Sequence, residues 1–590
     1  MTESSEVGAL LAAVTALRDR VDQAAFPLSV GGADEARSER RALLAQLDDY
    51  VIPRLVDIDA PLLAVVGGST GAGKSTLVNS ILARRVSRSG VLRPTTRSCV
   101  LVHHPDDERW FTTPRILPNL NRISGHEGEA GLEDPSALRL VSVDTLPPGV
   151  AVLDAPDIDS VVAANRDLAR QLLAAADLWV FVTTAARYAD AVPWDLLRQS
   201  VERGTSVSVV LDRVPPGAER EISAHLKDML VAEGLRDAPV FTVTESALGS
   251  DGMLPDEQVA PLRDWLARLG EDARARGVVV RRTLAGALDS MDRRVEGLAR
   301  ASAEQVETAS QLDDIVTSAY GSALHEVSAG MSDGRLLRGE VLARWQEFVG
   351  TGEFLKQIEV GFGRLRDRIT AAITGRPAPA TELGEALQSG VAQLLVAHAE
   401  GAGLEVARRW RAVPGSEDLL VTQPAAQADS TESGRSRVPA VAPEIGAASP
   451  DLPDRAETLV REWQSDILDL VRSEGKDRRT TARVLSMGVN AVGVVLMLVV
   501  FSHTMGTLGG AEVGIAGGSA VLAQRLLEAV FGDQAVRTLA AKARAQLLER
   551  TRALYDEEAD RLRELVARAN VRPEQAAELD DVARDLRAAR

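Results

Sequence analysis

Cysteine, basic patches and a targeting signal are scarce or missing in this chain of 590 residues. There is a single cysteine, Cys99, which rules out an internal disulfide framework and suits a reducing cytosol. The formal charge is −18, and no local basic patch stands out against it. This balance argues against nucleic-acid binding, because an acidic surface repels phosphate backbones. The N-terminal stretch MTESSEVGALL lacks a basic n-region, so no signal peptide is expected.

The clearest motif is a glycine-rich stretch that directly follows an apolar run of strand length. The stretch LLAVVGGSTGAGKST contains Gly68-x4-Gly73-Lys74-Ser75, which is the full phosphate-loop pattern in its required context. Glycines let the backbone wrap a triphosphate closely, and the following helix presents its positive end to the same anion. We expect Lys74 to reach the β and γ phosphates and Ser75 to bind Mg²⁺. The predicted nucleotide-binding residues of the loop are Gly68, Ser69, Thr70, Gly71, Ala72, Gly73, Lys74, Ser75 and Thr76.

The length of the chain predicts two to four folded units. From Pro61 to about Arg274, apolar strand runs alternate with helical stretches, which predicts an α/β domain with a mostly parallel sheet. The predicted strands are LLAVV, SCVLVH, LRLVSV, VAVLD, LWVFVTT, VSVVL and PVFTV. The phosphate loop follows the first strand, so this domain is expected to bind a nucleotide.

Two further stretches predict the metal site and the catalytic site. A Pro-Thr-Thr sequence lies about twenty residues after the lysine, where a GTPase places its first switch, so Thr95 or Thr96 is expected to ligate Mg²⁺ and sense the γ-phosphate. The run VAVLD ends in Asp154, and a carboxylate at the end of such a strand protrudes beside Mg²⁺. We therefore predict Ser75, Thr95, Thr96 and Asp154 as metal ligands, and Lys74, Thr95, Thr96 and Asp154 as catalytic residues.

Two residues depart from the usual pattern for water attack on a nucleotide. Asp157 stands where the D-x-x-G pattern has a glycine that donates its N–H to the γ-phosphate, and its carboxylate adds a repulsive charge there. Ile158 stands where Ras has the glutamine that orients the attacking water. The sequence therefore predicts that hydrolysis uses another group or is slow.

The base-recognition segment also departs from the usual pattern. Where N-K-x-D would hold guanine, the chain has Asp212, Arg213, Val214 and Pro215. Pro215 removes a carboxylate that accepts two hydrogen bonds from guanine, and such charge-assisted bonds contribute roughly 1.5 to 3 kcal/mol each. Selectivity for guanine over adenine is thus expected to be eroded unless another acid substitutes, although Arg213 could stack on the base. The other predicted base contacts are Asp212 and the loop residues Thr244, Glu245 and Ser246.

These motifs occur in the order and spacing of GTPases of the translation-factor class. The stretches LVNSIL and PTTR are similar to Era-like proteins, and helices on both sides of the domain with a late apolar segment resemble bacterial dynamin-like proteins. The motif resemblance covers about residues 60 to 250. It implies GTP and Mg²⁺ as cofactors and self-association through the G domain or a helical stalk. Thr70 departs from the glutamine that is usual in a dynamin phosphate loop.

Outside the nucleotide domain the sequence is mostly helical. The N-terminal helices are predicted to pack on the helical bundle, with packing inside the nucleotide domain as the alternative. The last helices suit a coiled-coil return to the bundle. We divide the chain into N-terminal helices at 1–58, a P-loop G domain at 59–274, a helical bundle or stalk at 275–412, a disordered proline-rich linker at 413–455, a helix at 456–483, membrane segments at 484–525 and C-terminal helices at 526–590.

A long uncharged run predicts attachment to a membrane. Residues 484–502 carry no charge and follow four basic residues, which is typical of a transmembrane helix with a cytoplasmic flank. A second apolar stretch, 505–523, contains Glu512, which is unfavourable at the bilayer centre, so a re-entrant or interfacial segment is the alternative there. Two spans would form a hairpin. The prediction places the protein at the cytoplasmic membrane, with the G domain and both termini on the cytoplasmic side.

Together these features predict a membrane-anchored dynamin-like GTPase that binds and hydrolyses GTP with Mg²⁺ and couples nucleotide state to a helical stalk. Its predicted partners are membrane lipid and further copies of itself, and no nucleic acid. Two alternatives remain open: an Era-like regulatory GTPase that acts on a soluble partner, and a non-hydrolysing nucleotide-sensing membrane scaffold. Asp157, Ile158 and Pro215 favour the scaffold.

Overall fold

The chain folds into two compact units. The computed structural model describes residues 2–87, 99–113, 116–117, 120–124, 137–157, 163–202, 204–332, 379–420, 445–474 and 533–590. The first unit comprises Met1–Phe26, Gly32–Ala303 and Arg572–Arg590, and the second comprises Pro27–Gly31 and Glu304–Val571. Each unit therefore combines segments that are far apart in the sequence.

An eight-stranded sheet with the order β3-β4-β2-β5-β1-β6-β7-β8 forms the centre of the first unit. Only β2 and β5 pair antiparallel, so the predicted mostly parallel sheet is confirmed. β3 is missing from the predicted strands because its sequence, NRIS, has a single apolar residue. The strands are β1 (Leu62–Gly68), β2 (Cys99–His103), β3 (Asn121–Ser124), β4 (Ala137–Ser142), β5 (Val150–Asp154), β6 (Leu178–Thr184), β7 (Ser206–Val214) and β8 (Val240–Thr244).

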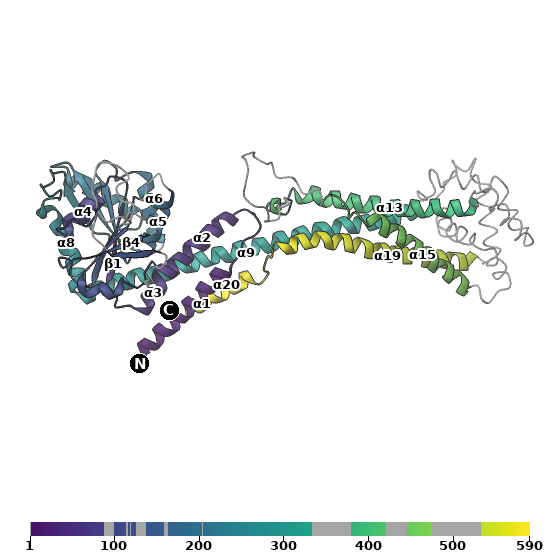
Figure 1. The fold of residues 1–590 in the computed structure, drawn as a ribbon, viewed down its shortest axis with the longest axis horizontal. Coiled ribbons are helices and arrows are strands. Elements are labelled where there is room, and N and C mark those ends of the chain that lie inside the picture. Colours follow the sequence, from purple (N-terminus) through teal and green to yellow (C-terminus); the bar gives the residue numbers. More distant parts are fainter. Residues whose placement is uncertain are drawn as a thin grey trace, which may run out of the picture. The chain divides into compact units, whose positions relative to one another are not determined.

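Helices cover both faces of this sheet (Figure 1). Alternate residues of β1 enter opposite cores: Leu63 and Val65 enter one, Leu62 and Val66 the other. A strand that is buried on both faces reads as a continuous apolar run, which is why β1 could be recognised from sequence. The first core contains α5 (Ala163–Ala174), α6 (Ala191–Glu202) and α7 (Glu219–Ala232), and the second contains α4 (Lys74–Ile81) and α8 (Asp256–Glu271). A short 3-10 helix, η2 (Pro105–Trp110), follows β2.

The helices at the two ends of the chain share a third core with α9 (Ala273–Ser332). Leu17, Met291 and Leu586 come from three of these helices and are almost fully buried. The side chain of Gln575 also accepts a hydrogen bond from Ala25 N at 2.9 Å and donates one to Ala25 O at 3.0 Å. The N-terminal helices thus pack on α9. The terminal helices are α1 (Thr2–Gln23), α2 (Ala33–Gln46), η1 (Leu47–Val51), α3 (Ile52–Val56) and α20 (Gln575–Ala589).

A buried ion pair joins α3 to the sheet. The guanidinium of Arg54 contacts the carboxylate of Asp177 and donates to the carbonyl of Ala60 at 2.9 Å. The same carboxylate accepts from Leu63 N of β1 at 2.8 Å, and the Asp177 carbonyl accepts from Thr283 Oγ1 of α9 at 2.8 Å. Asp177 therefore connects an N-terminal helix, the strand before the phosphate loop and α9.

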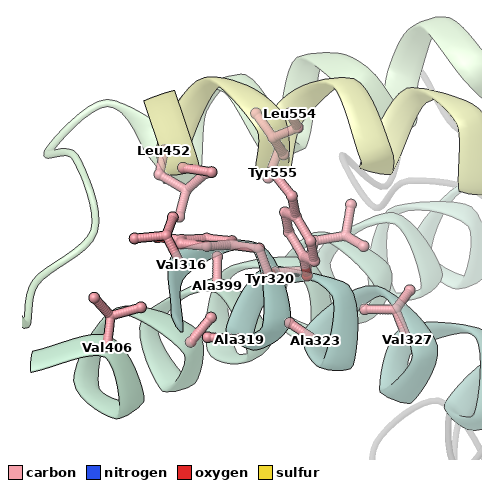
Figure 2. Close-up of a cluster of buried hydrophobic side chains, with 14 of the residues drawn as sticks. Val316, Ala319, Tyr320, Ala323, Val327, Ala399, Val406, Leu452, Leu554 and Tyr555 are labelled. Atoms are coloured by element: carbon pink, nitrogen blue, oxygen red, sulfur yellow. Dashed lines mark hydrogen bonds between the residues drawn. The ribbon is translucent and has the colours of Figure 1, made fainter. Parts of the chain in front are cut away.

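The second unit is a bundle of long helices. Three buried rings donate hydrogen bonds to backbone carbonyls: Trp410 to Leu312 at 3.1 Å, Trp463 to Ala543 at 2.9 Å, and Tyr555 to Leu395 at 2.8 Å. Figure 2 shows the ring of Tyr555 beside that of Tyr320, with 6.1 Å between their centroids. The helices are the part of α9 from residue 304, α13 (Pro379–Trp410), α14 (Glu417–Leu420), α15 (Leu452–Glu474) and α19 (Asp533–Arg568).

Contacts between these helices show that neighbours run antiparallel, because the residue number falls on one helix as it rises on the other. It follows that Ser332, Pro379, Glu474 and Asp533 all lie at the same end of the bundle. The contacts are Leu312–Trp410 and Glu326–His398 between α9 and α13, Asp313–Arg563 and Ser328–Arg544 between α9 and α19, and Arg455–Glu557 and Trp463–Ala543 between α15 and α19.

The predicted linker at 413–455 differs from the structure at both of its ends. Val413 and Ile445 are buried in the core of the bundle, and α15 begins at Leu452. Isolated apolar residues without a helical period gave no sequence signal for this packing. No helix within the described ranges is long and apolar enough to cross a membrane, and residues 484–525 lie outside those ranges.

Candidate functional site

The phosphate loop connects β1, a central strand, to α4. It lies where the carboxyl end of β1 leaves the sheet. Gly68 lies so close to β6 that an added Cβ would be 2.1 Å from the carbonyl oxygen of Val182, so no larger residue fits. Gly71 and Gly73 have φ angles of 77° and 91°, in the left-handed region that favours glycine. Ala72 N donates to the carbonyl of Ser69 at 3.1 Å and tightens the loop. The backbone therefore has the curvature that the motif predicts.

Lys74 is buried, and its ammonium makes three hydrogen bonds. Two go to backbone carbonyls of the loop itself, Gly68 O at 2.9 Å and Ser69 O at 3.0 Å. The third goes to Oδ1 of Asp157 at 2.5 Å. An ammonium has three hydrogens, so these contacts use its full donor capacity. The carboxylate at the usual glycine position thus contacts the lysine that is predicted to bind phosphate.

The predicted metal-site residues Ser75 and Asp154 meet at the ends of β1 and β5. Ser75 Oγ donates to Asp154 Oδ2 at 2.7 Å, and Ser87 Oγ donates to the same oxygen at 2.5 Å. Asp154 is fully buried, and burial raises its pKa, opposed by these two hydrogen bonds and by the charge of Lys74. Its Oδ1 has no hydrogen-bond partner among the described residues. A buried, unsatisfied carboxylate oxygen beside a hydroxyl is a set of hard oxygen donors that fits Mg²⁺.

Ser87 was not among the predicted site residues. Asn79 of α4 positions it: its Oδ1 accepts from Val86 N at 2.8 Å and Ser87 N at 3.0 Å, and its Nδ2 donates to Ser87 O at 2.8 Å. An asparagine in a helix and a serine in a loop carry no sequence signal for this arrangement. Thr95 and Thr96, the predicted switch ligands, and Ile158 lie outside the described residues.

One of the predicted base-recognition residues, Asp212, lies beside the phosphate loop. Asp212, at the end of β7, approaches Gly73 so closely that a Cβ on the glycine would be 2.4 Å from Asp212 Oδ2. Burial raises the pKa of Asp212, and a hydrogen bond from Arg213 N at 2.8 Å opposes the rise. Arg213 adopts a φ of 52°, within an irregularity in the pairing of β7 with β8. The structure therefore places Asp212, which was predicted to contact the base, next to Gly73 of the phosphate loop.

The last predicted base-contacting residues are Thr244, Glu245 and Ser246. Thr244 ends β8, and the other two residues follow it. Thr244 Oγ1 is 3.5 Å from Glu219 Oε1 at the start of α7, and Glu245 N donates to Val214 O at 2.8 Å. The Oγ of Ser246 is buried without a hydrogen-bond partner in the part of the chain that the structure describes. Glu219 is an acid near this segment that sequence spacing did not single out.

The remaining loop residues have identifiable contacts. Arg187, after β6, donates to Thr70 O at 3.2 Å and to Asp190 at 2.9 Å, which places a guanidinium over the loop. Thr76 O accepts from Ser80 Oγ within α4 at 2.7 Å. The Oγ of Ser69 is buried and unpaired among the described residues. Ser69 and Asp154 of the predicted site thus each have a buried polar atom without a partner among the described residues, and such atoms also occur elsewhere in this unit, for example at Asp177 and Ser208.

Comparison with known proteins agrees with this geometry. Residues 63–214 match the dynamin family. This stretch of the first unit is similar to a dynamin-family domain. The matched residues run from β1 to the end of β7 and include the phosphate loop, Asp154 and Asp212. The predicted resemblance to dynamin-like GTPases is confirmed for this domain, and the dynamin family is a family of GTPases.

No curated protein matches the chain. Two solved structures are both described as an oligomerised bacterial dynamin pair that provides a mechanism for the long-range sensing and tethering of membranes. Each is 10% identical; one covers 97% of this chain and 94% of its own with a TM-score of 0.42, the other 98% and 94% with 0.41. Likeness at this level carries no argument about function.

Proposed function

We propose that this protein is a membrane-anchored dynamin-like GTPase that binds and hydrolyses GTP with Mg²⁺. The observation that carries the proposal is the convergence of Lys74, Ser75 and Asp154 on one phosphate loop within a dynamin-family domain. Two of these residues follow β1 and the third ends the adjacent strand β5, so the sheet itself brings them together.

Each residue has a role that its geometry supports. Lys74 would hold the β and γ phosphates, and the loop N–H groups at the start of α4 would bind the same anion. Ser75 Oγ and Asp154 would hold Mg²⁺, which neutralises charge on the phosphates when bound. Arg187, over the loop, supplies a cation near the phosphate position. The group that orients the attacking water is not among these contacts.

The proposed membrane attachment rests on the ends of the helical bundle. Residues 475–532 connect Glu474 of α15 to Asp533 of α19, and these two residues lie at the same end of the bundle. A segment that leaves and returns at one end has the connectivity of a membrane hairpin. The uncharged run at 484–502 supplies the apolar length. We propose that this end of the bundle faces the cytoplasmic membrane.

The test compares GTP turnover by the full-length protein with and without liposomes. The proposal expects Mg²⁺-dependent turnover that liposomes increase, because membrane binding would order the bundle and bring G domains together. Turnover that is insensitive to liposomes would favour an Era-like regulator with a soluble partner. Competition between GTP and ATP in the same preparation measures selectivity for guanine. Strong selectivity would mean that another acid, such as Glu219, makes the contact that Pro215 cannot make.

One observation favours a second candidate, a nucleotide-sensing scaffold that does not hydrolyse GTP. The contact between Lys74 and Asp157 places a negative charge in the phosphate site. Tight nucleotide binding without turnover, with or without liposomes, would support this candidate over the GTPase.

A further inference from the structure

The contact between Lys74 and Asp157 has a consequence for nucleotide choice. Lys74 is 6% exposed, and the three hydrogens of its ammonium are used by Gly68 O, Ser69 O and Asp157 Oδ1. A phosphate oxygen that binds this ammonium must displace one of these acceptors. The two carbonyls belong to the loop backbone, whereas the Asp157 carboxylate is on a rotatable side chain and is 28% exposed. Asp157 is therefore the acceptor that a phosphate would displace.

We infer that Asp157 is an internal competitor for the phosphate site and discriminates against the triphosphate in favour of the diphosphate. The inference rests on the proposed nucleotide site. Asp157 occupies the position where the usual glycine N–H would donate to the γ-phosphate. After displacement the carboxylate remains next to the added anion, and like charges at this range repel strongly where water is partly excluded. A diphosphate lacks the γ-phosphate and avoids most of this repulsion.

The effect should be visible in binding affinities. The substitution Asp157→Asn removes the charge and keeps the shape of the side chain. We expect it to tighten binding of a non-hydrolysable GTP analogue at least about tenfold, in line with the usual size of effects at a charged contact. Binding of GDP should tighten less, so the ratio of the two dissociation constants changes. Titrations of the full-length protein with each nucleotide measure this ratio directly.

Two matched variants separate the charge at this position from other causes. Asp157→Glu keeps the charge and should bind the analogue as weakly as the unaltered protein. Asp144→Asn removes one charge from an exposed turn after β4 of the same domain and should leave both affinities unchanged. Because Asp157 is partly exposed, none of these changes should prevent folding, and circular dichroism checks this.

Repeating the titrations with EDTA tests the main competing role, in which Asp157 helps to hold Mg²⁺. If Asp157 competes with the phosphate, Asp157→Asn should bind the analogue more tightly than the unaltered protein does, both with and without Mg²⁺. A Mg²⁺-holding role predicts weaker binding for Asp157→Asn in Mg²⁺ alone, and that result would overturn the inference. Equal affinities of Asp157→Asn and the unaltered protein would also overturn it, as would an equal gain in Asp144→Asn.

The outcome is separable from that of the proposed function. If Lys74→Ala loses nucleotide binding while Asp157→Asn binds like the unaltered protein, the nucleotide site stands and the inference is wrong. If neither the unaltered protein nor Asp157→Asn binds guanine nucleotides, both are wrong.

Discussion

Glu558 of the bundle and Asp154 of the G domain are both buried carboxylates, but their partners differ. In the bundle, Glu558 is 1% exposed, contacts Arg455 and Arg561, and accepts a hydrogen bond from Ser449 N at 3.0 Å. In the G domain, Asp154 is fully buried and is contacted by two hydroxyls, and its Oδ1 is unpaired among the described residues.

The partners of the two acids distinguish a structural acid from a candidate ligand-binding acid. A buried carboxylate that the fold neutralises with arginine contributes to packing, because its charge and its lone pairs are satisfied by the chain itself. A buried carboxylate with hydroxyl partners and an open oxygen is completed by something else. Asp154 has hydroxyl partners, whereas Asp177 of the same unit has Arg54, so Asp154 is the candidate for binding a ligand.

The largest expected effect is on the phosphate site itself. Lys74→Ala should weaken binding of a GTP analogue at least about a hundredfold, because two charge-assisted phosphate contacts are lost. The melting temperature of the nucleotide-free protein should fall moderately, because the carbonyls of Gly68 and Ser69 lose the donor that Lys74 supplies. Calorimetric titration measures the loss. Unchanged affinity would contradict the phosphate-loop assignment.

Asp154→Asn should separate the metal role from the structural one. The amide oxygen can still accept from Ser75 and Ser87, so the fold should persist, and removal of a buried charge should raise the melting temperature of the free protein. The Mg²⁺ dependence of nucleotide affinity should fall about tenfold or more, because a charged metal ligand is lost. Titrations with and without EDTA measure this dependence. A variant that keeps it would show that Asp154 is only structural.

Arg455→Met should produce the opposite pattern in the second unit. It leaves Glu558 with weaker neutralisation, and loss of one partner of a buried ion pair destabilises by roughly 3 kcal/mol. Arg561 remains nearby and reduces the effect. Urea unfolding measures the change in the free energy of unfolding, and nucleotide affinity should not change. A stability equal to that of the unaltered protein would show that Glu558 does not need Arg455.

A third buried acid, Asp49, has an effect on stability that depends on pH. Burial raises the pKa of Asp49, on η1, to about 6, against a hydrogen bond from Gln171. The unfolded chain releases this proton at lower pH. The free energy of unfolding therefore falls as pH rises from about 4 to about 6, and it stays at the lower value above pH 6. Asp49→Asn should therefore stabilise the protein by roughly 2 kcal/mol at pH 7 and by almost nothing near pH 4. Urea unfolding at both pH values checks this, and an equal gain at both would exclude titration of Asp49 as the cause.

Features made by consecutive residues were determined by the sequence alone. The phosphate loop at 68–75 depends on local backbone geometry, and an apolar run before it predicts a buried strand, so Lys74, Ser75 and the parallel sheet could be predicted. Asp154 could be predicted because it ends an apolar strand run, and the carboxyl ends of parallel strands meet at one edge of a sheet.

Only the tertiary structure decided which distant side chains meet. The contacts of Asp157 with Lys74 and of Ser87 with Asp154 span 83 and 67 residues and depend on β5 lying next to β1. The antiparallel directions of α9, α13, α15 and α19 likewise follow from side-chain packing, because an apolar helical face specifies burial but not the partner that buries it. Local rules thus located the site, and strand order and helix pairing determined which groups complete it.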